Sequence, residues 1–272
     1  VTDAILLKNT NKGKGYSATV KLERLTTKGL TTMVAYNYSN TQDLMSAGSI
    51  AFSSWRDNFS VNGNNRPDLG FSNNDLRHRI IAALSYRKEY ADHFASQISF
   101  FFQAQNQGRF SYRVNGDLNG DQLTSNDLLY VPRDASEMNF QDYTITVSGN
   151  PVTFTATDQS AAFDAYINQD EYLSSRRGQY AERNGVLMPW VSTIDLSFVQ
   201  DFFVDVKGKR NTIQLRADIF NFGNLINNNW GVGDRIINSS PLEFRGVTAG
   251  VPQYRFSAVN GELPTSTYGT RT

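Results

Sequence analysis

Five oxygen-bearing side chains in one short segment have a spacing that could bind a cation. Asp117, Asn119 and Asp121 alternate along the chain, and Asn126 and Asp127 follow closely. Ca²⁺ takes six to eight oxygen ligands, which alternate residues on a tight glycine-containing loop can supply. The sequence predicts a calcium loop with Asp117, Asn119, Asp121 and Asp127 as ligands. Calcium is the one cofactor that it indicates.

The same segment departs from the best-known calcium loop, that of the EF-hand. There, Gly stands at the sixth position and a bidentate Glu at the twelfth. Counted from Asp117, these positions hold Gln122 and Leu128. The alternative is a cluster of Asx turns, in which the carboxylates accept hydrogen bonds from nearby backbone N–H groups. Both interpretations stay open from the sequence.

The other residue types that could do chemistry are too few or too isolated. His78 and His93 are the only histidines, and neither has a partner at ligand spacing. We expect His78 to be an aromatic-girdle or lipid-face residue near a strand end. The absence of Cys excludes disulfides, thiolate metal sites and cysteine nucleophiles. With no Gly-x-Ser-x-Gly element, phosphate-binding loop or zinc-protease motif, no enzymatic activity is expected.

Charge gives no reason to expect a nucleic-acid partner. The chain has 26 Lys and Arg against 26 Asp and Glu, a formal net charge of +0. Phosphate binding needs a clustered excess of cations. The acidic pair at 170–171 and the basic pair at 176–177 are interpreted as solvated loop charges.

Apolar and polar residues alternate in six segments with the period of a β-strand. These segments are residues 16–26, 30–38, 76–86, 94–104, 190–202 and 213–219. In the first, Tyr16, Ala18 and Val20 oppose Ser17 and Thr19, which places one face in an apolar medium and the other in water. Residues 254–256 indicate the start of a seventh strand.

The connections between these segments alternate in length. Short ones at 27–29, 89–93 and 205–210 alternate with long ones at 40–74, 108–188 and 223–253. Aromatic residues gather towards strand ends. A bilayer imposes this pattern on a β-barrel, whose alternation keeps overall hydropathy low, here a mean of −0.44. The sequence predicts an all-β fold: an antiparallel transmembrane β-barrel segment of about six or seven strands of a larger barrel, with long extracellular loops. A soluble β-sandwich is the alternative.

The long loops are rich in aromatic residues. Such side chains can grip a sugar or peptide, or they can pack the loops on one another, which is the commoner use. The residues concerned are Trp55, Phe71, Phe110, Tyr112, Tyr130, Tyr143, Tyr172, Tyr180 and Trp230.

Three segments resemble TonB-dependent outer-membrane receptors. The run from Pro189 to Phe198 and the Asp-x-Phe-Asn-x-x-Asn run from Asp218 to Asn224 resemble their late strands. Residues 115–132 resemble a loop of the Oar-like receptors, relatives of the SusC-like importers. The resemblance covers about residues 14 to 272.

The resemblance implies that residues 1–272 are part of one C-terminal transmembrane barrel domain in the bacterial outer membrane. It implies an N-terminal plug domain, which lies outside this chain. The chain opens without Met or a signal region, as expected for part of a longer protein. The chain ends in polar residues at 268–272, and the closing strand of the barrel is therefore expected to be missing from it. The implied partners are outer-membrane lipid, a TonB-type energy-transducing protein reached through the N-terminal region, and a surface lipoprotein.

The expected function is uptake of a scarce nutrient bound at the extracellular loops. A structural or adhesive barrel whose loops bind proteins or surfaces is the alternative, and a passive porin is disfavoured by the length of the loop at 108–188. The substrate stays open, because siderophore, cobalamin, oligosaccharide and peptide importers share this barrel.

Overall fold

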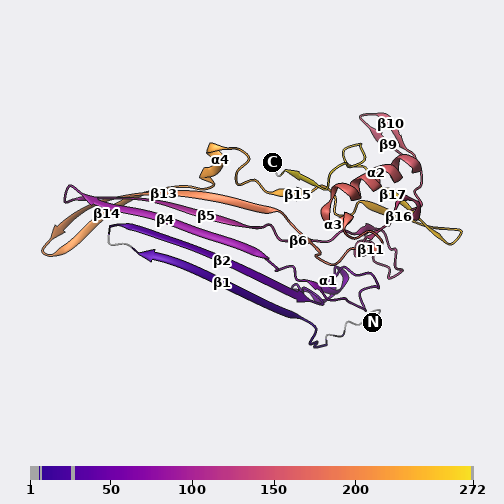
Figure 1. The fold of residues 1–272 in the computed structure, drawn as a ribbon, viewed down its shortest axis with the longest axis horizontal. Coiled ribbons are helices and arrows are strands. Elements are labelled where there is room, and N and C mark those ends of the chain that lie inside the picture. The colour runs from indigo at the N-terminus through magenta and orange to yellow at the C-terminus, as the bar shows by residue number, and fades with distance from the viewer. Residues whose placement is uncertain (1–5, 7, 26–27, 271–272) are drawn as a thin grey trace.

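Long antiparallel strands form one extended sheet in the computed structural model, which describes residues 6, 8–25 and 28–270. The long strands are β1 (Lys14–Leu25), β2 (Leu30–Asp43), β4 (His78–Tyr90), β5 (Phe94–Asn106), β13 (Trp190–Val206) and β14 (Lys209–Ile219). They pair in the order β1-β2-β4-β5-β13-β14, and the short β3 (Gly70–Phe71) also pairs with β2. This long sheet is a meander of hairpins (Figure 1). The predicted segments 30–38, 94–104, 190–202 and 213–219 lie within antiparallel strands, whereas β4 begins two residues after the predicted start at 76 and the predicted end at 26 lies outside the described residues.

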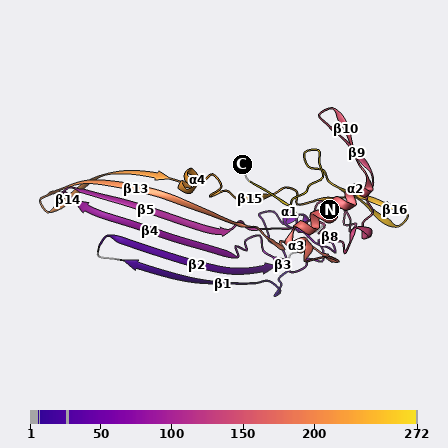
Figure 2. The same ribbon diagram turned by 45° about the horizontal axis from the view of Figure 1, so that its top comes forward.

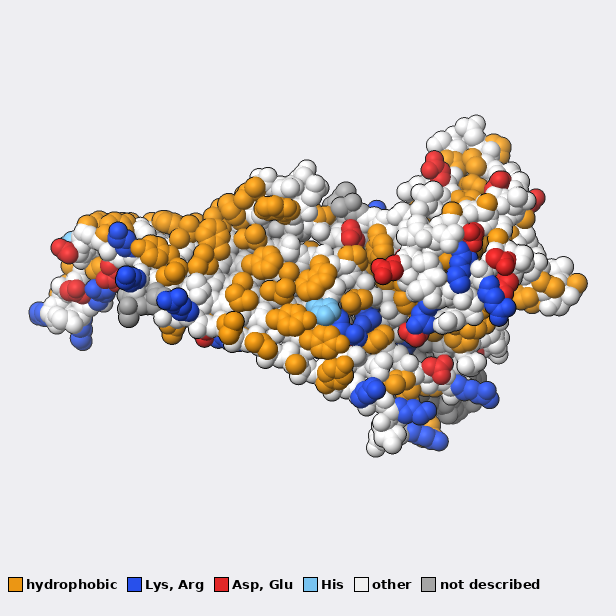
Figure 3. All heavy atoms as spheres, viewed as in Figure 1, with side chains coloured by type: hydrophobic (Ala, Val, Ile, Leu, Met, Phe, Trp, Pro, Cys, Tyr) orange, Lys and Arg blue, Asp and Glu red, His pale blue; other side chains and the backbone are white. Residues whose placement is uncertain are grey.

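The register of the long sheet collects the apolar residues of all its strands on one face. Leu84 stands opposite Phe100, and Phe100 stands opposite Leu196. Many side chains on this outward face are exposed: Val20 is 64% exposed and Ile213 is 72% exposed. Figure 3 shows hydrophobic side chains over the visible side of the sheet, with charged side chains gathered at its ends. Such a surface needs an apolar surrounding.

The opposite, inward face carries polar side chains that bond to one another, together with apolar residues such as Phe101 and Val199. Ser85 and Ser99 share a hydrogen bond of 2.9 Å, and Arg79 donates to Gln103 at 2.8 Å. Because successive side chains of a strand point to opposite faces, the alternating sequence places apolar residues on the outward face and polar groups on the inward face.

The sheet stays open between its first and last strands. Among the described residues, β1 pairs only with β2, and β14 pairs only with β13. An open edge leaves a row of unpaired backbone groups. The antiparallel β prediction is therefore confirmed, while the size of a closed barrel stays a prediction. No helix among the described residues is long and apolar enough to cross a membrane.

The long connections fold together at one end of the sheet (Figures 1 and 2). We call residues 44–77, 107–189 and 234–270 the loop head. Its elements are α1 (Ala51–Arg56), β6 (Arg109–Phe110), β7 (Val114–Asn115), β8 (Tyr130–Val131), η1 (Ala135–Glu137), β9 (Tyr143–Val147), β10 (Asn150–Phe154), α2 (Ala156–Gln169), α3 (Glu171–Ser174), β11 (Gln179–Tyr180), β12 (Val186–Leu187), β15 (Asp234–Ile236), β16 (Leu242–Thr248), β17 (Val251–Phe256) and β18 (Tyr268–Thr270). A short helix, α4 (Phe222–Ile226), connects β14 to it.

The prediction that residues 254–256 begin another strand of the barrel is wrong. These residues end β17, which pairs with β16 in a separate sheet completed by β7. Phe256 is fully buried against the rings of Phe163 and Tyr166. The alternation there reflects the core of the loop head rather than lipid.

Candidate functional site

The loop head has a hydrophobic core of its own, although its sequence shows no sustained period. Residues of the 108–188 connection, among them Tyr112, Phe163 and Ile167, pack with Leu242 and Phe256 from β16 and β17. The helix α2 begins at a cap in which the Thr155 hydroxyl accepts from the backbone N–H of Asp158. The head is therefore a folded unit that can hold side chains in fixed positions.

Most of the loop aromatics take part in this packing. Phe110 meets Tyr112 edge-on with ring centroids 4.9 Å apart, and Tyr130 packs on Tyr180 at 5.2 Å. The packing interpretation is thus confirmed for these residues. Trp230 lies outside this core: it is 47% exposed and lies beside Gly223 of α4.

A buried acid lies at the centre of the head. The Tyr112 hydroxyl donates to the Asp170 carboxylate at 2.9 Å, and the same carboxylate caps α3 by accepting from Leu173 N at 2.8 Å. Burial, reinforced by Tyr166 and Asp170, raises the pKa of Tyr112, and burial raises the pKa of Tyr166 to about 12. Both phenols therefore stay protonated, and the Tyr112 hydroxyl acts as a donor to Asp170.

The prediction that Asp170 is a solvated charge is wrong, because it is only 4% exposed. Its sequence neighbour Glu171 is exposed, as predicted. The basic residues beside them form ion pairs, Arg176 with Glu182 at 2.6 Å and Arg177 with Asp164 at 2.7 Å. Capping of α3 and the Tyr112 hydroxyl explain the burial of Asp170, and neither is visible in the local sequence.

Buried ion pairs fasten the head to the ends of the long strands. Arg183, 5% exposed, reaches Asp43 at the end of β2 over 2.6 Å. Gly70 lies so close that a Cβ there would stand 2.9 Å from the Arg183 carbonyl oxygen. A side chain at position 70 would therefore push this loop away from the strand.

A second fastening centres on Asp75, whose side chain is fully buried. It lies 2.5 Å from Arg109 and 3.3 Å from Arg77, and it accepts from the backbone N–H of Thr41 at 2.9 Å. The Arg109 guanidinium also stacks on the Phe71 ring at 3.7 Å. Burial lowers the pKa of Arg109, and Asp75 opposes that shift. No local pattern marks this cluster, because Arg109 comes from a different connection than Phe71, Asp75 and Arg77.

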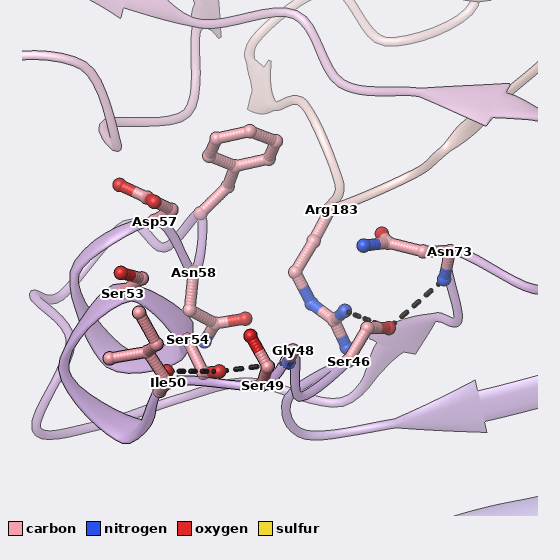
Figure 4. A pocket seen from close by; sticks show the side chains of 11 residues that line it. Ser46, Gly48, Ser49, Ile50, Ser53, Ser54, Asp57, Asn58, Asn73 and Arg183 are labelled. Atoms are coloured by element: carbon pink, nitrogen blue, oxygen red, sulfur yellow. Dashed lines mark hydrogen bonds between the residues drawn. The ribbon is translucent and has the colours of Figure 1, made fainter.

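A polar pocket of about 450 Å³ lies beside Arg183, between α1 and the segment that leaves β2. Figure 4 shows the Asn58 amide oxygen and the Asn73 amide nitrogen turned into it. Among the described residues, the hydroxyls of Ser49 and Ser53 have no hydrogen-bond partner. The pocket therefore offers free donors and acceptors to a ligand.

The charges at this pocket are already neutralised. Asp57 pairs with Arg56 at 2.7 Å, an interaction that lowers the pKa of Asp57. Arg183 pairs with Asp43, and the Ser46 hydroxyl donates to the same carboxylate at 2.8 Å. The lining therefore suits hydrogen bonding to an uncharged polar ligand better than neutralisation of an ion.

The predicted calcium ligands do lie near one another in the loop head. The Asp117 carboxylate accepts from the backbone N–H groups of Gly120 at 2.7 Å and Asp121 at 3.0 Å. Asp127 accepts from Leu118 N at 2.6 Å and from the side-chain amide of Asn119. This geometry is that of linked Asx turns. In the described part of the chain, no group of three or more His, Cys, Asp or Glu side chains is arranged to hold a metal ion.

Calcium binding by these residues stays a prediction. Burial raises the pKa of Asp127, although hydrogen bonds from Leu118 and Asn119 oppose the shift. A cation would have to replace backbone donors that already satisfy the carboxylates. We therefore expect any binding to be weak.

His78 packs within an aromatic group on the outward face, as predicted. Its ring stacks on Trp190 at 5.7 Å, and its Nδ1 atom lies 2.7 Å from the Tyr36 hydroxyl. Tyr38 contacts the same ring at 5.3 Å. His93 lies elsewhere, with Nδ1 at 3.2 Å from the Phe203 carbonyl oxygen.

Comparison with known proteins adds one match. The family model described as "Outer membrane beta barrel domain" matches residues 2–241. No curated protein and no solved structure matches the chain. The match covers all six long strands and most of the loop head.

Proposed function

Because the chain belongs to the family of outer membrane beta barrel domains, we propose that it is part of a TonB-dependent receptor that imports a scarce nutrient. The family match places the chain in the bacterial outer membrane. The finer assignment rests on the resemblance of the late strands to such receptors and on the folded loop head. The remaining partners, a TonB-type transducer and a surface lipoprotein, belong to the same proposal.

The observation that carries the proposal is the polar pocket beside Arg183. Its free groups, on Ser49, Ser53, Asn58 and Asn73, are hydroxyls and amides. Such groups fix the orientation of a small ligand by hydrogen bonds. We therefore propose an uncharged polar compound as the nutrient.

The position of the pocket supports uptake rather than simple surface attachment. Arg183 lines the pocket and at the same time binds Asp43, the last residue of β2. A ligand that shifts Arg183 would act directly on the end of a barrel strand. An adhesive surface needs no such connection.

The proposal is tested on the full-length receptor purified from its native outer membrane. Native mass spectrometry should detect a co-purified polar compound, and the double variant Ser49→Ala with Ser53→Ala should retain at least tenfold less of it. The matched control, Ser240→Ala with Ser257→Ala, removes two hydroxyls outside the pocket lining and should retain the compound.

Transport is then tested with the compound so identified. Cells should lose its uptake when either the receptor or the TonB-type protein is deleted. Uptake that continues without the TonB-type protein, or a full-length gene without a plug-like domain, would contradict the TonB-dependent assignment. Cells that lack the receptor and lose surface attachment while their uptake of the compound is unchanged would favour the adhesive alternative.

A further inference from the structure

A polar cluster interrupts the apolar outward face near the short turns. The Ser96 hydroxyl donates to the Gln200 amide oxygen at 2.6 Å, and the Tyr90 hydroxyl lies 2.9 Å from Ser96 and 3.2 Å from Gln200. These residues come from β5, β13 and β4, so the register of three strands builds the cluster. Polar side chains on a lipid-facing surface are costly in the hydrocarbon layer.

Lys88 stands next to this cluster on the same face. It lies opposite Ser96, which in turn lies opposite Gln200. Its neighbours in sequence, Arg87 and Glu89, point to the inward face by alternation. Lys88 is therefore the cation that β4 presents outward at this level.

The charges on the inward side at this level are paired, but Lys88 is not. Arg87 contacts Asp201 at 2.6 Å, and Arg210 contacts Glu89 at 3.0 Å. Within the described residues, the exposed Lys88 has no ion-pair partner. An anion from the surroundings would neutralise the charge of Lys88.

The depth of the cluster agrees with a membrane boundary. The other boundary is marked by the aromatic group of Trp190, His78 and Tyr36, and Gln200 follows Trp190 by ten positions on β13. Ten residues at about 3.3 Å each, on a strand tilted by about 40°, span about 25 Å along the membrane normal. An outward apolar band of a transmembrane barrel is about 25 Å tall.

We propose that Lys88, Tyr90, Ser96 and Gln200 bind the headgroup of an anionic phospholipid in the leaflet nearer the short turns. Lys88 contacts the phosphate. The hydroxyls of Tyr90 and Ser96 donate to Gln200, so their oxygens accept hydrogen bonds from the hydroxyl groups of a glycerol headgroup. The site requires only that this sheet is part of an outer-membrane barrel; it does not depend on the proposed uptake function. A receptor with another substrate would keep it.

The first experiment measures lipid selectivity in the full-length receptor. The receptor is reconstituted in phosphatidylcholine vesicles, and electron paramagnetic resonance compares the association of spin-labelled phosphatidylglycerol and phosphatidylcholine. Lys88→Gln should lower the preference for phosphatidylglycerol about fivefold, since one surface cation contributes about that much. The control Lys21→Gln removes the same charge from the inward face, where Lys21 pairs with Glu23 at 2.8 Å, and should leave the preference unchanged.

A second experiment measures depth and keeps the proposal testable if Lys88→Gln folds poorly. The 272 residues contain no Cys, so a cysteine introduced at Gln200 or at Ile194 can carry a fluorophore. Nitroxides near the headgroup should quench the label at 200 more strongly, and nitroxides in mid-chain the label at 194. A label at 200 that mid-chain nitroxides quench best, or equal preference in Lys88→Gln and the parent protein, would overturn the headgroup site.

Discussion

Asp75 connects the long sheet to the loop head through a fully buried carboxylate. In Asp75→Asn, Arg109 would lose its counter-charge while staying enclosed. Breaking a buried ion pair costs about 3–5 kcal/mol, because the remaining charge is uncompensated. We expect the free energy of unfolding of the loop head, measured by urea titration with limited proteolysis, to fall by about that amount.

The control for this variant is Asp57→Asn, which removes the partner of Arg56 in an exposed pair. Solvent screens such pairs, so its urea midpoint should match that of the parent protein. Equal effects of the two substitutions would show that the burial of Asp75 does not matter to the stability of the head.

The calcium prediction also belongs to single residues. A binding loop should release or absorb heat when the full-length receptor is titrated with Ca²⁺, at the millimolar affinities typical of extracellular modules. Affinity should fall as the pH falls through the raised pKa of Asp127, because the protonated carboxyl cannot bind the ion. Asp127→Asn should abolish this response, and a flat titration at millimolar Ca²⁺ would end the prediction.

The protonation of Asp127 also affects folding, with the opposite dependence on pH. Its pKa is raised in the folded protein, so its contribution to stability is fully present below its ordinary pKa and is lost as the pH rises through the folded value. Ca²⁺ would therefore compete with protons for a carboxylate that the fold prefers neutral.

At the scale of elements, each long strand separates two media, and adjacent positions on β4 test this directly. Leu84 lies in the middle of the outward face and Ser85 lies on the inward face. Arginine on the lipid face near the bilayer midplane costs about 2–4 kcal/mol. We expect Leu84→Arg to destabilise the receptor in lipid vesicles, so that its free energy of unfolding falls by that amount.

Ser85→Arg is the matched control, because it introduces the same charge one residue away on the face that bonds through Ser99. It should leave folding in vesicles nearly unchanged. The opposite order of the two effects, measured by urea titration, would reverse the assignment of the faces.

At the scale of the whole molecule, the open sheet limits what this segment can do alone. The edges β1 and β14 have no partner on their free sides among the described residues. Unpaired backbone groups are not tolerated in lipid. We expect the isolated 272-residue chain not to insert as a closed monomeric barrel. Heat-modifiable migration on a gel would contradict this expectation.

The sequence by itself determined the six long strands, their faces and the membrane setting. Side chains of a strand alternate between its faces, so a local pattern such as Tyr16, Ala18 and Val20 against Ser17 and Thr19 is enough to separate an apolar face from a polar one. The place of His78 among aromatic residues followed from the same alternation. These features depend on neighbours in sequence.

Only the tertiary structure decided how the long connections fold. Arg183 meets Asp43 across 140 positions, and Asp170 meets Tyr112 across 58. No local period marks such partners, because contacts that close long loops are set by the packing of the whole head. For the same reason β17 was mistaken for a barrel strand, and the pocket beside Arg183 could not be predicted.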